Sequence, residues 1–245
     1  MIDIFPIPSI MGGERMETTE KFVRWTASHW GAIIATTVVT AALIGGALRQ
    51  PLEVRQKVCR FLAVVVGLIY LGDSSYILLT QYHGTWEQNI PLHFCSMMLL
   101  VAVIALWTRC RAFCWLLYFG ALTACLQGLI TPALNADFPT LRYFFFFMLH
   151  GILMPAALAV PLLLGMRARL RDVIIAQLMM DAYLVCVHPI NLLLGTNYGF
   201  TMASPVPGCI LDYAGPAPWY YLLLQIPAFA LFCLLRLPVR EKKEV

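Results

Sequence analysis

Seven long apolar runs dominate the chain and leave few folds open to it. Each run is close to the ~20 residues that a helix needs to cross a hydrocarbon core about 30 Å thick. Lipid cannot satisfy backbone polar groups, so segments of this length and composition are expected to cross it as helices. We therefore predict an all-α, polytopic membrane protein, a bundle of seven transmembrane helices at about Trp30–Leu48, Phe61–Gln81, Ile90–Trp107, Ala112–Ile130, Tyr143–Leu164, Val173–Leu194 and Pro218–Leu237.

The composition leaves little chain for a separate soluble domain. The 245 residues are 60% hydrophobic and 12% charged, whereas soluble domains carry about 25% charged residues. We expect a short extracytoplasmic arm over 1–29, the membrane domain over 30–237 and a basic cytoplasmic tail over 238–245. The arm has no long apolar stretch of the signal-peptide kind. The net charge of +4 does not indicate nucleic-acid binding, because its placement follows the membrane loops.

The placement of basic residues predicts the orientation of the bundle. Thirteen of the 17 Lys and Arg residues follow the first, third, fifth and seventh apolar runs. Cytoplasmic loops carry an excess of Lys and Arg, so we place the amino terminus outside and the carboxyl terminus in the cytoplasm. The thirteen are Arg49, Arg55, Lys57, Arg60, Arg109, Arg111, Arg167, Arg169, Arg171, Arg236, Arg240, Lys242 and Lys243; the other four are Arg15, Lys21, Arg24 and Arg142.

With this orientation, polar residues within the membrane concentrate on its outer side. Two of the five histidines are expected at the outer surface and three in the outer halves of their helices. A carboxylate and several amides lie at mid-membrane or further out. The set consists of the surface pair His29 and His83, the deeper His93, His150 and His188, and Asp73, Gln127, Asn191 and Asn197. This asymmetry predicts an outward-facing polar chamber, since polar groups inside membranes usually face a bundle interior or a wet cavity.

His150 is the first candidate for chemistry. It lies about two turns into the stretch LRYFFFFMLHG, 141–151, within one apolar run. A histidine at that depth needs a partner. The alternative is a structural histidine that is hydrogen-bonded to a neighbouring helix.

The run 173–194 carries a narrow polar stripe. At ~100° per residue, Gln177, Asp181, His188 and Asn191 fall within about 80° of one another. We interpret the stripe as one wall of a functional cavity. The alternative is hydrogen bonding between helices, which polar residues on a single face commonly provide.

Two further candidates lie on the second and third runs. Asp73 is in the middle of an apolar stretch, so we expect it to be protonated or paired with a histidine, which it could orient for catalysis. A buried structural hydrogen bond is the alternative. His93 and Cys95 are two residues apart, about 200° around a helix, so both cannot face one chamber without distortion of the first turn. Cys95 is a nucleophile only if a histidine such as His150 activates it, and core filling otherwise.

The eight cysteines contain no CxxC pair and do not resemble a disulfide framework or a zinc site. The outer connection 195–217 is rich in Gly, Pro, Asn and Ser. Its aromatic residues predict ordered turns that cap the chamber.

Five motifs together resemble a known family. They are PLHFC at 91–95, LQGLITP at 126–132, FPTLRYFFFFMLHG at 138–151, NLLLGTNYGF at 191–200 and DYAGPAPWY at 212–220. The chain resembles the YwaF family of bacterial integral membrane proteins, which is similar to the transmembrane protein 164 family of animals. The resemblance covers roughly residues 60–235. It implies a multi-pass protein of the bacterial cytoplasmic membrane.

The resemblance also implies an acyltransferase-like activity on phospholipids, with a cysteine on the third helix and a later histidine as the catalytic pair. The histidine corresponds to His150. The cysteine of the animal pattern directly follows a proline and precedes a histidine. Here Leu92 takes that place and Cys95 comes two residues after His93, so the cysteine does not correspond directly.

Three functions follow from these features, in order of preference. The first is a membrane enzyme that acts on lipid acyl esters without a cofactor, with His150 as the base and Cys95 or a water as the nucleophile, and His93, Asp73 or Asp181 orienting partners. The second is a metal-dependent lipid hydrolase whose zinc is held by some of His93, His150, His188 and a carboxylate. The third is a transporter or receptor with the chamber as its ligand site. The candidate substrate-binding residues are Gln127, Arg142, Asp181, His188, Asn191 and Asn197.

Overall fold

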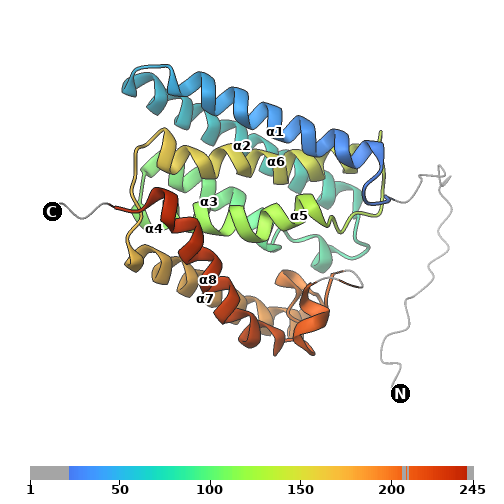
Figure 1. The fold of residues 1–245 in the computed structure, drawn as a ribbon. Helices are drawn as coiled ribbons and strands as arrows, with labels where there is room; N and C mark the ends of the chain where they lie inside the picture. Colours follow the sequence, from blue (N-terminus) through green and yellow to red (C-terminus); the bar gives the residue numbers. More distant parts are fainter. Residues whose placement is uncertain (1–21, 206–207, 209, 242–245) are drawn as a thin grey trace.

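A computed structural model describes residues 22–205, 208 and 210–241. Most of the expected arm and the end of the expected tail lie outside these residues. The described chain is all-α (Figure 1). Its elements are α1 (Ala27–Leu48), α2 (Leu52–Thr80), η1 (Trp86–Asn89), α3 (Phe94–Thr108), α4 (Arg111–Gly120), the π-helical η2 (Ala121–Cys125), α5 (Leu126–Ile130), α6 (Leu141–Leu162), α7 (Leu170–Leu194), η3 (Tyr198–Phe200), η4 (Ile210–Ala214), α8 (Tyr220–Arg236) and η5 (Leu237–Val239).

The helices confirm the polytopic membrane protein. In the described residues, six segments are long and apolar enough to cross a membrane, with α4, η2 and α5 forming one continuous segment over 111–130. The remaining helix of the expected seven is α3, which is apolar but shorter, with 15 residues. It begins at Phe94 rather than Ile90, because Ile90 and His93 have extended backbone. The prediction that the run 90–107 is helical from its start was therefore wrong by about one turn.

α6 is the central helix of the bundle. It packs against α1, α2, α3 and α4, and it has the largest buried share of the candidate spans. Figure 1 shows α1 and α2 together on one side of it and the α7–α8 pair on the far side of α4. Thr140 begins α6 by accepting a hydrogen bond from the Tyr143 backbone N–H at 3.2 Å. This cap satisfies one of the N–H groups that a helix start leaves without an intrahelical partner.

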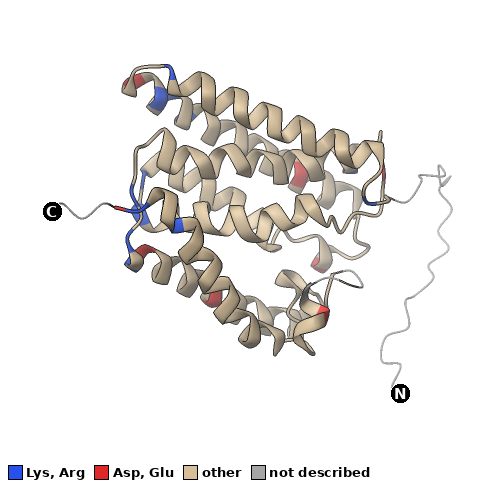
Figure 2. Cartoon of the chain, viewed as in Figure 1, with Lys and Arg blue, Asp and Glu red and all other residues tan. Residues whose placement is uncertain are grey.

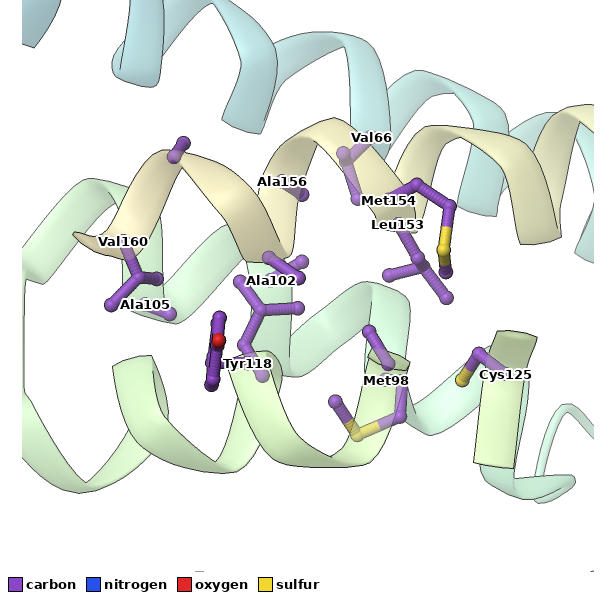
Figure 3. Packing of buried hydrophobic residues seen from close by; sticks show 14 of the residues in the cluster. Val66, Met98, Ala102, Ala105, Tyr118, Cys125, Leu153, Met154, Ala156 and Val160 are labelled. Atoms are coloured by element: carbon purple, nitrogen blue, oxygen red, sulfur yellow. The ribbon is translucent and has the colours of Figure 1, made fainter. Parts of the chain in front are cut away.

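The packed interior lies where α3, α4 and α6 meet. Figure 3 shows small residues such as Ala102 and Ala156 among larger ones such as Met98 and Leu153. All four are buried. Small residues let membrane helices approach closely, so this interior holds the central helices at fixed positions.

Basic residues collect at one end of the bundle, the end at which α8 ends (Figure 2). Arg111 binds Asp172 there through Nε and Nη2, at 2.8 and 2.5 Å, and joins the start of α4 to the first turn of α7. The η5 segment that follows α8 is bound nearby, since Ala168 donates its N–H to the Val239 carbonyl at 2.9 Å.

Candidate active site

Cys95 and His150 meet in the interior. Cys95 is in the first turn of α3, and His150 lies in the middle of α6. The Cys95 thiol is within hydrogen-bonding reach of the His150 imidazole. His150 is 6% exposed and Cys95 is half-buried. A thiol and an imidazole in contact are the parts of an activated cysteine nucleophile.

One ring nitrogen of His150 is held by its own helix. Nδ1 lies 2.8 Å from the carbonyl oxygen of Phe146, one turn earlier, and a carbonyl can only accept. Nδ1 therefore carries a proton and donates it. In the neutral ring Nε2 is then free of a proton and can accept one from a thiol. The Phe146 ring also packs on the imidazole, with centroids 4.3 Å apart.

Gly128 on α5 makes room for the other edge of the imidazole. A Cβ atom at this position would lie 2.4 Å from Cδ2 and 2.5 Å from Nε2 of His150. No larger residue fits while the ring stays in place. Gly128 thus sets how closely α5 approaches α6 beside the reactive nitrogen.

A second thiol completes the centre. Cys125 is the last residue of the π-helical η2 and is fully buried. It points into the interior (Figure 3), and its thiol is within hydrogen-bonding reach of Cys95. π-helical turns inside α-helices are rare and occur often at functional sites. Here the turn places Cys125 beside Cys95.

Asp73 pairs with an arginine, not with a histidine. Arg142 Nη1 donates to Asp73 Oδ1 at 2.7 Å, which joins α6 to α2, and both side chains are nearly buried. The Arg142 guanidinium also lies over the Tyr82 ring, 5.2 Å from its centroid. The expectation of a histidine partner for this carboxyl was wrong, because its partner is Arg142. Burial in a membrane requires a partner for each charge, and the two residues supply one for each other. The ion pair is an electrostatic neighbour of His150.

His93 belongs to an aromatic cluster at the start of α3. It precedes α3 as its N-cap residue, so its separation from Cys95 does not follow the 200° rule for two helical residues. Its ring packs on Tyr198 and Phe200 of the outer connection, with centroids 5.0 and 5.7 Å away. Tyr183 on α7 adds a tie to the same region by donating to the Leu92 carbonyl at 2.7 Å.

Asn191 uses its whole side-chain amide to hold the outer connection. Its Nδ2 donates to the Tyr198 carbonyl and to Thr201 Oγ1 at 2.7 and 2.8 Å. Its Oδ1 accepts from Thr196 Oγ1 and the Tyr198 N–H, both at 2.8 Å. Tyr198 in turn donates its hydroxyl to the Glu87 carbonyl, and burial raises its pKa to about 12, which keeps that donor protonated. These bonds order part of the connection as expected.

The remaining polar candidates form hydrogen bonds with other residues of the protein. Gln177 donates to Gln225 of α8 at 2.6 Å, and Gln225 donates to Asp181 at 3.0 Å, so this part of the α7 stripe joins two helices. His188 lies 3.1 Å from Thr201 Oγ1. Two others bond locally: Gln127 to Thr131, and Asn197 to the backbone at 202 and 203.

His29 lies in the first turn of α1 and is fully buried. Its Nδ1 accepts the Trp25 N–H at 3.0 Å, so its Nε2 carries the proton and donates to the Leu129 carbonyl at 2.8 Å. This fixes the start of α1 on α5. Both ring nitrogens of His29 are therefore occupied by backbone groups.

Sequence reasoning missed Cys125, Gly128 and Tyr183. A glycine within an apolar helix is the one signal that could have found a close approach at Gly128. In the described residues, no three His, Cys, Asp or Glu side chains come together as metal ligands. The zinc set considered for His93, His150 and His188 therefore has no counterpart there.

The chain is similar to a known protein family and to a bacterial protein. A protein-family model described as the TMEM164 family matches residues 24–236. The chain is 28% identical over 239 residues to an uncharacterized protein of Treponema pallidum (strain Nichols), covering 95% of this chain and 96% of that protein. No solved structure matches.

Proposed function

The chain belongs to the TMEM164 family of membrane proteins, and within that membrane setting we propose that it transfers acyl groups between lipids by a cysteine–histidine mechanism. One observation carries the proposal: the Cys95 thiol meets an imidazole whose Nδ1 is committed to a carbonyl, so that Nε2 is the nitrogen left to act as a base. The surrounding bundle supplies an apolar, water-poor setting, which suits transfer to a lipid better than hydrolysis.

In the first half-reaction, His150 takes the proton of the Cys95 thiol. The thiolate attacks the carbonyl carbon of a lipid ester, and a carbon–sulfur bond forms. When the intermediate collapses, the ester carbon–oxygen bond breaks, and the lysolipid oxygen leaves with the proton that His150 returns. The acyl group then remains on Cys95 as a thioester.

The second half-reaction reverses these steps with another lipid hydroxyl. His150 takes the proton of the hydroxyl, and its oxygen attacks the thioester carbonyl. The carbon–sulfur bond breaks, and the thiol regains a proton. Asp73 and Arg142 hold α2 and α6 together beside the imidazole, so we assign them a positioning role. Arg142 is the candidate contact for a lipid phosphate, since it is the cation among the predicted substrate-binding residues.

We also propose the finer topology, with the amino terminus outside and the bundle in the bacterial cytoplasmic membrane. The collection of basic residues at the C-terminal end of the bundle supports it (Figure 2), as does the similarity to a bacterial protein. The Cys95–His150 centre then lies away from the basic end.

The test is turnover of a chain-labelled phospholipid by purified protein in vesicles, with a lysolipid as acceptor. Cys95→Ser should lose most of the rate, because a serine hydroxyl is far less acidic than a thiol. His150→Ala should lower it by about 10²-fold or more. Cys110→Ser is the matched control, since it removes an exposed thiol at the basic end, away from the centre, and should retain transfer.

Trapping gives the second readout. Wild-type protein incubated with donor alone should carry an acyl group on Cys95 that hydroxylamine releases. Transfer that survives both Cys95→Ser and His150→Ala would refute the mechanism. Loss of transfer with a chelator but not with Cys95→Ser would instead favour the metal-dependent hydrolase.

A further inference from the structure

An apolar groove runs along α1. It has a volume of about 420 Å³, and α1, α5 and α6 line it. On α1 it extends from Ile33 to Leu48, and Leu129 and Met154 contribute to the facing walls. No charged residue lines it. Because these helices cross the membrane, an occupant must be compatible with hydrocarbon.

The dimensions of the groove suit a single hydrocarbon chain. Ile33 and Leu48 are separated by about 22 Å at a rise of 1.5 Å per residue. A helix of ~10 Å diameter and that length fills on the order of 1,700 Å³. This is about four times the groove volume of about 420 Å³, so a partner helix does not fit. One extended hydrocarbon chain is the thinner apolar occupant that a membrane supplies.

The groove is also long enough for the chain of a membrane lipid. Two acyl layers make a hydrocarbon core of about 30 Å, so one chain extends about 15 Å. A Cβ at Gly151 would lie 2.9 Å from Thr36 Oγ1, so Thr36 of α1 lies beside Gly151 of α6. From Thr36 to Leu48 the groove continues for about 18 Å.

Two of the helices that line the groove, α5 and α6, also carry residues of the reactive centre. On α6, His150, Met154 and Leu158 follow one another at four-residue intervals and so share one face. On α5, Leu129 lines the groove and is the neighbour of Gly128, on which the imidazole rests. His29 fixes this wall by its hydrogen bond to the Leu129 carbonyl.

We propose that this groove holds one acyl chain of the lipid whose ester reacts at Cys95. The inference rests on the proposed function and specifies where its substrate binds. The ester lies at the level of His150 and Gly151, and the chain extends along α1 towards Leu48. The length of the groove then limits the length of the chain that is transferred.

Two adjacent glycines of α1 give a matched pair of test variants. Gly45 lines the groove, whereas Gly46 is exposed and does not. A Cβ at either position would meet nothing within 4 Å, so a tryptophan at either one should leave the helix packing intact. Gly45→Trp would fill the groove about 13 Å from Thr36, and Gly46→Trp would project elsewhere, about 100° around the helix.

The binding test uses a phosphatidylethanolamine with a photoreactive group at the end of one acyl chain, in phosphatidylethanolamine–phosphatidylglycerol vesicles with full-length protein. In the wild type and in Gly46→Trp, the label should concentrate on the groove helices α1, α5 and α6. In Gly45→Trp the groove label should be lost. Equal labelling of Gly45→Trp and wild type, label spread evenly over α7 and α8, or groove cross-links to a second copy would overturn the proposal.

Transfer assays separate the groove from the chemistry. Gly45→Trp should shift transfer towards shorter chains, and Gly46→Trp should keep the wild-type preference. Groove labelling that persists in Cys95→Ser supports the binding site whatever the fate of the mechanism. Cys95-dependent transfer with an unchanged chain preference in Gly45→Trp would overturn the groove and leave the mechanism standing.

Discussion

Gly128 and His150 are in contact across the α5–α6 interface, and the space for the imidazole exists only because Gly128 has no side chain. A Cβ at this position would approach Nε2 to 2.5 Å. The same nitrogen is the one left free by the Nδ1 bond to Phe146. Gly128 therefore acts on the proposed chemistry through the position of the ring.

Gly128→Ala should lower acyl transfer while the protein still folds. The imidazole must move by the order of 1 Å to admit the methyl group, and a misplacement of that size can cost about 10²-fold in rate. The loss should appear in kcat and in the rate of Cys95 acylation. Gly31→Ala is the control, because a Cβ there meets nothing within 4 Å. Unchanged acylation in Gly128→Ala would show that the ring does not need its present position.

Asp73 and Arg142 should depend on each other for stability. Removing one partner of a buried ion pair leaves an uncompensated charge, which costs about 3–5 kcal/mol. Asp73→Asn and Arg142→Gln should each lower the unfolding temperature in detergent, and the double variant should lose much less than the sum of the two. Additive losses would mean that the pair seen between α2 and α6 contributes little coupling.

Asn191 should control the order of the outer connection. Asn191→Ala leaves several buried donors and acceptors without a partner, and each such group costs about 1–3 kcal/mol of stability. Hydrogen exchange should rise at Thr196, Tyr198 and Thr201 while α6 keeps its protection. Asn191→Asp retains the Oδ1 acceptor and loses the Nδ2 donors, so it should release the Tyr198 carbonyl side of the network selectively. Uniform exchange changes over the whole bundle would contradict a local role.

Labelling of two thiols, one at each end of the bundle, should reveal the topology. Cys110 is exposed beside Arg109 and Arg111 at the basic end, and Met202 is exposed on the outer connection. A membrane-impermeant maleimide applied to intact cells should label a Met202→Cys variant and leave Cys110 unlabelled until the membrane is opened. Mass spectrometry of peptides identifies the thiol. The reverse pattern would place the basic end outside.

The helices could be predicted from sequence because lipid imposes one simple requirement, a long apolar helical run. Their ends depend on local chemistry that hydropathy does not reveal. Pro91 sits in a turn closed by the Leu92 N–H and the Ile90 carbonyl, at 2.7 Å, and this delays α3 to Phe94. That delay removes His93 from the helix and invalidates the angular comparison with Cys95.

The site could be predicted only in part for a related reason. His150 stood out because it is polar where the membrane allows little polarity. The partners of each polar group depend on how helices pack, which spacing within one helix does not determine. Asp73 bonds Arg142 on α6, and Asn191 folds the connection back on itself. Gln177 and Asp181 join α7 to α8, the alternative that the stripe alone had left open.

The π-helical turn at Ala121–Cys125 has a consequence for how this site can be lost or acquired. A π turn accommodates one more residue than the α-helix around it. Deleting a single residue within the turn would restore regular winding and rotate one flank against the other by about 100°. Cys125 and Gly128 could not then both keep their present neighbours, although neither had been replaced. The arrangement of the reactive centre therefore depends on the number of residues in this turn as well as on their identity. A three-base deletion could separate the residues of the centre and still leave a membrane-spanning helix of nearly the same length and composition.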